Sequence, residues 1–328
     1  MTAVLEVRDL RTEFFTAAGT VRAVNDVSFS LDEGEIIGLV GESGSGKSVT
    51  GFSLLGLIDA PGRITGGSVR LNGSELVGMS RGELRRRRGR EIAMIFQDPI
   101  ATLNPLLTIG QQMGLALSAH ERLSPKATED RCTEALERVG IPSARARLKS
   151  YPHEFSGGMR QRVAIAIALL HRPKVIVADE PTTALDVSIQ AQIVTEMKML
   201  AREFGVAMIW ISHDLAVVSG IASRILVMYA GRIVETGTAA EVLRNPIHPY
   251  TRGLLDSMPH ATRPGEMLRQ IPGSMPSMLS LPPGCAFAPR CPRADAACTA
   301  VPELVQQGGR SWRCVHPLTQ PDHEGATA

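Results

Sequence analysis

The chain has 328 residues, of which 44% are hydrophobic and 21% are charged, and its formal net charge is +2. This composition is typical of a globular protein long enough for two domains, and the small net charge gives no electrostatic support for nucleic-acid binding. No apolar run approaches the roughly 18 residues of a membrane helix, so membrane contact is expected only through a partner. The N-terminal residues also lack the charged and apolar regions of a signal peptide.

The first 34 residues are expected to form strands. Apolar and polar side chains alternate over residues 26–31, which is the pattern of a half-buried strand. Asn72-Gly73 then gives a strong hairpin signal, so an antiparallel sheet should flank the core. Phe14 could stack on an adenine ring, but its position alone favours simple core packing.

Residues 41–48 read Gly-Glu-Ser-Gly-Ser-Gly-Lys-Ser and fit the phosphate-binding loop G-x-x-x-x-G-K-[ST]. An apolar strand is predicted before the loop, over residues 35–40, and a helix after it, over residues 49–58. This order favours a nucleotide site over a chance Gly/Ser-rich turn. Lys47 would reach the β- and γ-phosphates and the Ser48 hydroxyl would bind Mg²⁺. The nucleotide-binding residues predicted here are Ser43, Gly44, Ser45, Gly46, Lys47, Ser48 and Val49.

Three further apolar segments end in polar side chains. Gln97 follows the first, and its amide oxygen could bind Mg²⁺ or water. The second leads into Asp179 and Glu180, where Asp179 would reach the Mg²⁺ shell and Glu180 could polarise the attacking water as a general base. His213 follows the third. Such strand ends beside one phosphate loop predict a parallel sheet whose carboxyl edge forms the active site.

Ser156-Gly157-Gly158 immediately precedes a predicted helix over residues 159–170. Free N–H groups at a helix start can bind an anion. For an isolated segment of this kind, an ordinary helix cap without a ligand is the favoured interpretation.

Taken together, these motifs resemble the ATP-binding subunits of ABC transporters over roughly residues 4–255. The resemblance implies an α/β fold with a RecA-like core, an antiparallel β subdomain and a helical subdomain over about residues 98–160. The motifs that carry it are, in chain order, the phosphate loop, Gln97, the segment Ser156-Gly157-Gly158-Met159-Arg160-Gln161, Asp179-Glu180, Ala184-Leu185-Asp186 and His213.

The resemblance also implies roles for matching residues. Glu180 would be the catalytic base, and His213 would contact the γ-phosphate. Gln97 would couple Mg²⁺ and the attacking water to a membrane partner. Asp186 would lie at a dimer interface, and Phe14 becomes the adenine-stacking residue.

The same family forms head-to-tail dimers in which ATP lies between the phosphate loop of one subunit and the signature segment of the other. The signature here departs from the common LSGGQ by Phe155 and Met159, but the phosphate-facing Ser156, Gly157 and Gly158 are intact. We therefore expect these three residues to complete a partner's site.

Two segments narrow the resemblance to importers of dipeptides, oligopeptides and nickel. Residues 245–255 resemble the segment that closes the ATPase domain in those systems, and FSGGMRQR at residues 155–162 resembles one of their two ATPase subunits. The implied partners are a sister ATPase in a heterodimer, two transmembrane permeases and an extracytoplasmic solute-binding protein. The implied location is the cytoplasmic face of the inner membrane, as a peripheral subunit.

An ATP-binding domain is thus predicted over residues 1–255, followed by a Pro/Gly-rich C-terminal extension over residues 256–328. Four thiolates in so small a segment favour a metal that holds it together over unrelated reduced thiols. The lack of C-x2-C pairs favours an iron–sulfur cluster over zinc, and the extension resembles peptide-importer ATPases that hold a [4Fe–4S] cluster. The predicted ligands are Cys285, Cys291, Cys298 and Cys314.

The functional prediction is an ATPase that powers import of dipeptides or oligopeptides and uses ATP and Mg²⁺. A nickel or other small-solute importer is the alternative. A non-transport ABC ATPase of DNA repair or translation is less favoured. Only about a hundred residues separate the phosphate loop from the signature, they carry no heptads, and the chain has one ATPase cassette. An exporter half would usually carry fused membrane helices, which are not predicted.

Overall fold

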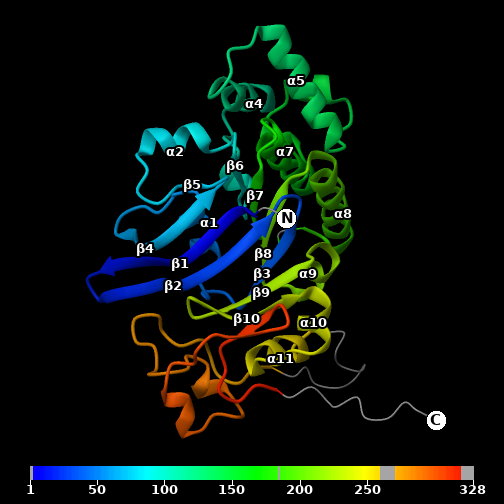
Figure 1. Ribbon diagram of the computed structural model, residues 1–328. Helices are drawn as coiled ribbons and strands as arrows, with labels where there is room; N and C mark the ends of the chain where they lie inside the picture. Colours follow the sequence, from blue (N-terminus) through cyan, green and yellow to red (C-terminus); the bar gives the residue numbers. More distant parts are fainter. Residues whose placement is uncertain (1–2, 184, 259–269, 319–328) are drawn as a thin grey trace, which may run out of the picture.

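A computed structural model describes residues 3–183, 185–258 and 270–318 of the chain (Figure 1). The strands are β1 (Ala3–Thr16), β2 (Gly19–Asp32), β3 (Ile36–Val40), β4 (Gly62–Leu71), β5 (Ser74–Glu75), β6 (Ile92–Ile95), β7 (Val175–Asp179), β8 (Ala207–Ser212), β9 (Arg224–Tyr229), β10 (Arg232–Thr238), β11 (Val305–Gln307) and β12 (Arg310–Trp312).

The α-helices are α1 (Lys47–Leu54), α2 (Arg81–Arg87), α3 (Pro99–Thr102), α4 (Ile109–Ser118), α5 (Pro125–Arg138), α6 (Ala144–Arg147), α7 (Gly157–Leu169), α8 (Val187–Phe204), α9 (Leu215–Ile221), α10 (Ala239–Arg244) and α11 (Pro249–Asp256). Short 3-10 helices are η1 (Pro152–Glu154), η3 (Ala288–Arg290) and η4 (Ala296–Thr299).

The larger sheet has the strand order β11-β12-β10-β9-β3-β8-β7-β6. Strands β6, β7, β8, β3 and β9 run parallel. The phosphate loop after β3 and the polar residues after β6, β7 and β8 predicted this for four of the strands, whereas β9 was not predicted. Every residue of β3 is buried, because both faces of the strand are covered. Ile37 and Leu39 face one hydrophobic core, and Ile36 and Val40 face the other. This alternation fixes the register of β3, since a shift by one residue would exchange the two faces.

The smaller sheet is antiparallel and has the order β2-β1-β4-β5. The predicted hairpin is confirmed, because Asn72 and Gly73 join β4 to β5 with φ angles of 48° and 75°. One core cluster contains side chains from this sheet, from α1 and from one face of the larger sheet. Helix α1, which follows the phosphate loop, is thereby held between the two sheets.

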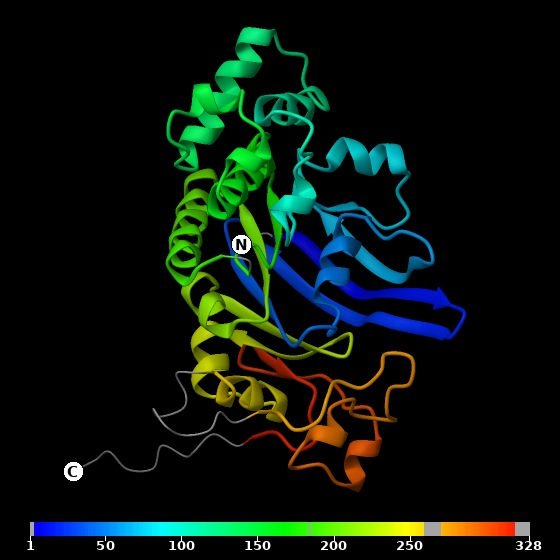
Figure 2. The ribbon, with the colours of Figure 1, turned by 180° about the vertical axis from the view of Figure 1, so that it is seen from behind.

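Helices α3 to α7 form a region that projects from the β6 and β7 side of the larger sheet (Figure 1). Local sequence sets its helix starts. A capping box joins Thr108 and Gln111 at α4, and Ser124 caps α5 just before Pro125. Residues 270–318, drawn in orange and red, lie at the opposite end of the molecule in both views (Figures 1 and 2).

Residues 270–318 are joined to the larger sheet more closely than their composition suggested. Strand β12 pairs antiparallel with β10, so the C-terminal segment extends the sheet. The guanidinium of Arg310 donates to the fully buried carboxylate of Glu235 over 2.9 Å, and Phe287 and Trp312 are buried. The sequence suggested a segment that depends on a metal to fold, whereas here strand pairing and buried side chains also attach it to the core.

Candidate functional site

The phosphate loop connects the end of β3 to the start of α1, as predicted. Gly46 has φ 104°, and a Cβ added to it would lie only 2.2 Å from the Ala23 carbonyl oxygen, which is far too close. Only glycine fits this position without moving backbone. The loop is thus pressed against β2, and its N–H groups sit at the start of a helix, where an anion is favoured.

Lys47 is buried beneath the loop. Its ammonium donates to the carbonyl oxygens of Gly41 at 2.8 Å and Glu42 at 2.9 Å. Burial lowers the pKa of Lys47, while the carboxylates of Glu180 and Asp179 nearby act in the opposite direction. The ammonium is therefore held as part of the loop, in position to meet a phosphate.

Ser48 and Asp179 bring the phosphate loop and β7 together. The Ser48 hydroxyl donates to the Asp179 carboxylate over 2.9 Å. Burial raises the pKa of Asp179, and the Ser48 hydrogen bond partly offsets that effect. Hydroxyl and carboxylate oxygens are the ligands that Mg²⁺ prefers, so the pair fits the predicted ion.

Three side chains lie within hydrogen-bonding distance of one carboxylate oxygen of Glu180. Thr183 Oγ1 donates over 2.9 Å, Gln97 Nε2 donates over 3.2 Å, and His213 Nδ1 lies at 3.2 Å. Glu180 also has φ 45°, a left-handed conformation that is uncommon outside glycine. The turn after β7 thus aims this carboxylate toward the ends of the neighbouring strands.

These groups surround a cavity of about 810 Å³, large enough for a nucleotide. Phe14 lines it rather than packing in the core, which favours the implied adenine contact over the interpretation from position alone. The described residues that line the cavity are Phe14, Val21, Ala23, Gly41, Glu42, Ser43, Gly44, Gly46, Lys47, Ser48, Val49, Gln97, Glu180, Thr183, His213, Leu254 and Met278.

Two predicted residues lie beside this cavity rather than on its wall. Ser45 is fully buried, and its carbonyl oxygen accepts from the Gly231 N–H, so its backbone ties the loop to the turn between β9 and β10. Asp179 lines an adjoining cavity of about 450 Å³ together with Ser48 and Gln97.

The signature residues and Asp186 are not among the described residues that line the nucleotide cavity. Ser156 caps α7, accepting from the Met159 N–H over 3.3 Å, and Asp186 precedes α8. An added Cβ on Gly158 would lie 2.9 Å from Ile189 of α8, so these two helix starts pack closely. Ala184, between Glu180 and Asp186, lies outside the described residues.

The four C-terminal cysteines lie near one another. The Cys285 N–H donates to the Cys298 carbonyl over 2.9 Å. Burial raises the pKa of Cys314 to about 11, and the charges of the other three thiolates add to that effect. The Arg293 N–H donates to the Cys291 sulfur over 3.4 Å. The four thiols are therefore close enough for their charges to affect one another.

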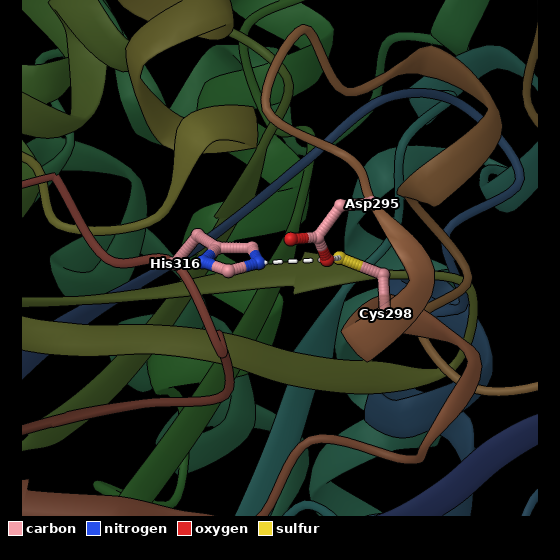
Figure 3. Close-up of side chains that lie close together, drawn as sticks. All are labelled: Asp295, Cys298 and His316. Carbon is pink, nitrogen blue, oxygen red and sulfur yellow. Dashed lines mark hydrogen bonds and ion pairs between the residues drawn. The ribbon is translucent and has the colours of Figure 1, made fainter.

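Figure 3 shows two additional ligand types beside Cys298. The ligand atoms of Asp295, Cys298 and His316 all lie within 4.8 Å of one another, and His316 Nε2 is 2.8 Å from an Asp295 oxygen. Asp295 and His316 were not predicted as ligands from the sequence, although His316 stands two residues after Cys314. Their carboxylate and imidazole keep a zinc site open as the alternative.

Several side chains that reach the nucleotide site from other segments were also not predicted from the sequence. Thr183 and Met278 line the cavity, and the Tyr250 hydroxyl accepts from the Glu42 N–H over 2.8 Å. The guanidinium of Arg290 reaches the Glu42 carboxylate. A Thr three residues after Glu180 could have been noticed, whereas the other three contacts have no local sequence signal.

Comparison with known families supports this geometry. Residues 24–183 match the ABC transporter family, and residues 234–298 match the oligopeptide/dipeptide transporter C-terminal region. The chain is 51% identical to the oligopeptide transport ATP-binding protein OppD of Escherichia coli, over 97% of this chain and 94% of the relative. The chain belongs to the ABC transporter ATP-binding family.

This ABC ATPase has further relatives of known sequence or structure. It is 50% identical to a putative peptide import ATP-binding protein of Brucella abortus, over 95% of this chain and 94% of that protein. An ATP-binding cassette solved as a dimer after hydrolysis, with ADP and Pi, superposes with a TM-score of 0.65 and 27% identity, covering 72% of this chain and 98% of that one. The structure of cbiO1 from Clostridium perfringens, which is part of an ABC transporter complex, superposes with a TM-score of 0.63 and 26% identity. The match covers 75% of this chain and 92% of that one.

The described part of this ABC ATPase contains no helix with the length and apolar character needed to span a bilayer.

Proposed function

We propose that this ABC ATPase hydrolyses ATP to power the import of dipeptides or oligopeptides. The observation that carries the ATPase assignment is the convergence of Lys47, Ser48, Gln97, Glu180 and His213 on one cavity. The peptide assignment rests on the C-terminal match to oligopeptide/dipeptide transporters and on the names of the relatives.

In this proposal Lys47 and the loop N–H groups hold the triphosphate, and Phe14 stacks on adenine. Ser48 and Asp179 hold Mg²⁺, which neutralises phosphate charge when bound. Glu180 accepts a proton from the attacking water or orients it. The Nδ1 atom of His213 is 3.2 Å from the Glu180 carboxylate, so the imidazole is near both the base and the expected γ-phosphate.

The three donors at the Glu180 carboxylate affect how well it can act as a base. Gln97 must release or reorient its amide if that oxygen is to accept a proton from water, because a carboxylate oxygen that already accepts three hydrogen bonds is a weaker base. Gln97 follows β6 and leads into α3, toward the helical region. Movement of that region could therefore be transmitted to the base through Gln97.

The proposed active form is a head-to-tail dimer with a sister ATPase. Ser156, Gly157, Gly158 and Asp186 do not line the described cavity of their own chain, so they are free to complete the partner's site. The solved relative that carries ADP and Pi is itself dimeric. Two different ATPases in one complex would make this a heterodimer, as the FSGGM form of the signature suggests.

The proposed membrane partners are two permeases, reached from the helical region. An apolar groove of about 330 Å³ lies between the end of α1, β6, α4 and α7. Side chains that line it include Leu57, Met94, Phe96, Ala116, Ala164 and Ile167. The groove adjoins Gln97, so a permease helix bound there would lie beside the residue that contacts Glu180. We propose that the ATPase works as a peripheral subunit at the cytoplasmic face of the inner membrane, served by an extracytoplasmic binding protein.

The proposed ligand of the four cysteines is a [4Fe–4S] cluster, with zinc as the alternative. Four thiolates match the ligand count of such a cluster, and a hydrogen bond such as that from the Arg293 N–H to the Cys291 sulfur would tune its reduction potential. Asp295 and His316 would replace two thiolates if the metal were zinc. In both cases the metal would cross-link the segment that carries Cys285 to Cys314.

The test is reconstitution of the ATPase with a sister ATPase, two permeases and a solute-binding protein. The proposal predicts ATP-dependent uptake of labelled dipeptides or oligopeptides into vesicles and little ATPase activity from this subunit alone. Uptake of nickel without peptide uptake would reassign the cargo. Full, concentration-independent hydrolysis by a verified monomer would contradict the shared-site dimer, and ATP hydrolysis stimulated by nucleic acid instead of permeases would point to a non-transport ATPase.

A further inference from the structure

An arginine from the C-terminal segment binds the phosphate loop directly. The two terminal nitrogens of Arg290 donate to the two carboxylate oxygens of Glu42, over 2.7 Å and 2.9 Å. The Arg290 side chain is only 4% exposed. This paired geometry is the strongest form of an arginine–carboxylate contact, and it fixes the orientation of both groups.

Glu42 is the second residue of the phosphate loop, and each of its polar groups has a partner. Its N–H donates to the Tyr250 hydroxyl over 2.8 Å, and its carbonyl oxygen accepts from Lys47 Nζ over 2.9 Å. The carboxylate held by Arg290 is thus on the same residue as a carbonyl that positions the phosphate-binding lysine.

Arg290 is itself anchored on both sides. Its Nε donates to the Pro272 carbonyl over 2.8 Å, and one terminal nitrogen is 3.3 Å from the Tyr229 hydroxyl. It ends η3, which lies between Cys285 and Cys291, and its guanidinium lies 6.0 Å from the ring centre of Phe287. The rings of Tyr229, Tyr250 and Phe287 contact one another with centroid distances of 4.6 Å to 5.3 Å. The position of the guanidinium is therefore fixed by the fold of the C-terminal segment.

We propose that Arg290 is a positioning residue for nucleotide binding, through which the cysteine-bearing C-terminal segment holds the phosphate loop in its binding conformation. The inference rests on the proposed ATP site. The link also has an electrostatic consequence, because Glu42 adds a negative charge to a loop that must bind a triphosphate. Arg290 neutralises that charge and holds both carboxylate oxygens in hydrogen bonds to its guanidinium.

Coupling of this kind is reciprocal. If the C-terminal segment favours nucleotide binding, nucleotide must favour the docked segment by the same factor. Binding of Mg-ATP should therefore slow hydrogen exchange over residues 285–298 in the natural protein, although those residues do not line the nucleotide cavity among the described residues.

The test measures Mg-ATP binding and hydrogen exchange in the full-length protein, purified without oxygen. Arg290→Ala should weaken Mg-ATP binding on the order of tenfold, within the range found for coupled sites. It should raise exchange over residues 41–48 and remove the effect of nucleotide on residues 285–298. Arg290→Lys keeps the charge but not the paired geometry, so it should restore binding only in part.

Arg310→Ala is the matched control. Arg310 also joins the C-terminal segment to the core through a buried carboxylate, Glu235, but it does not touch the phosphate loop. It should raise exchange over residues 305–312 and leave Mg-ATP affinity within about twofold. A double variant of Arg290→Ala and Glu42→Gln should bind no more weakly than Arg290→Ala alone, since both changes remove one interaction.

Unchanged Mg-ATP affinity in Arg290→Ala would overturn the inference. Equal losses in Arg290→Ala and Arg310→Ala would also overturn it, because general loosening of the segment would then explain the effect. Lys47→Ala tests the ATP site separately: if that variant still binds Mg-ATP, the proposed site itself is wrong, whatever Arg290 does.

Discussion

The Ser48 hydroxyl donates a 2.9 Å hydrogen bond to the Asp179 carboxylate, although 131 positions separate the two residues in the chain. The contact exists because β3 and β7 both flank β8 in one parallel arrangement, so their carboxyl ends meet at the same edge. The residue after the phosphate-loop lysine and the acid at the end of β7 therefore form one oxygen-rich site.

Ser48→Ala should weaken Mg-dependent ATP binding by at least about tenfold, because it removes a hydroxyl ligand and a hydrogen bond to a second ligand. Ser48→Thr keeps the hydroxyl and is the control. Titration of ATP binding against Mg²⁺ concentration checks this. If the alanine variant has the same Mg²⁺ dependence as the natural protein, Ser48 does not hold the ion.

Cys298→Ser should lower bound iron and sulfide and make residues 285–314 more sensitive to protease, because one of four thiolate ligands is lost. Anaerobically purified natural protein should be brown and contain about four iron and four sulfide per chain. Cys132→Ser is a matched control, since Cys132 is buried in α5, at the opposite end of the molecule from the four C-terminal cysteines (Figure 1).

Metal analysis together with a protease digest separates the possible outcomes. Stoichiometric zinc without sulfide would replace the cluster but keep the metal site, and Asp295→Ala should then reduce zinc content. Metal-free natural protein with an equally protected C-terminal segment would contradict both forms of the proposal. The segment would then be attached to the core by strand pairing and by the Arg310–Glu235 contact, without a metal.

Acid should destabilise the fold through His248. Burial lowers the pKa of its imidazole from 6.5 to about 4, and its Nδ1 accepts from the Tyr250 N–H at the start of α11. Between pH 6.5 and about pH 4, His248 binds a proton in the unfolded chain but not in the folded chain, so the stability of the fold decreases as the pH falls. The loss from pH 7 to pH 5 should be about 2 kcal/mol of unfolding free energy.

Urea unfolding at both pH values, with His248→Asn for comparison, checks the origin of this loss. Asparagine can still cap α11 but does not titrate, so the variant should lose about 2 kcal/mol less on acidification. An identical loss in both proteins would assign the acid effect to other groups.

Sequence patterns predicted the parallel sheet and its functional edge because both features leave a signal in short stretches of the chain. Apolar runs that end in Gln97, Asp179 or His213 mark strands buried on both faces, and only their order in the sheet was left to tertiary packing. The hairpin at Asn72-Gly73 was likewise a local signal.

The contacts of Arg290 and Tyr250 with Glu42 could not be predicted, because 248 and 208 positions separate these residues in the chain. Nothing in a short window shows that a C-terminal arginine ends beside the phosphate loop. The composition of the C-terminal segment was also misleading about what holds it, since its attachment uses a few large buried side chains and edge pairing with β10.

The most direct test of the proposed mechanism is phosphate release by Glu180→Gln in the assembled complex, with the sister ATP site disabled. Glutamine preserves the shape of the side chain but cannot accept a proton from water. The account predicts near-normal Mg-ATP binding with phosphate release reduced by about a hundredfold or more. Phosphate release close to that of the natural protein would remove Glu180 from its role as the base and contradict the proposed mechanism.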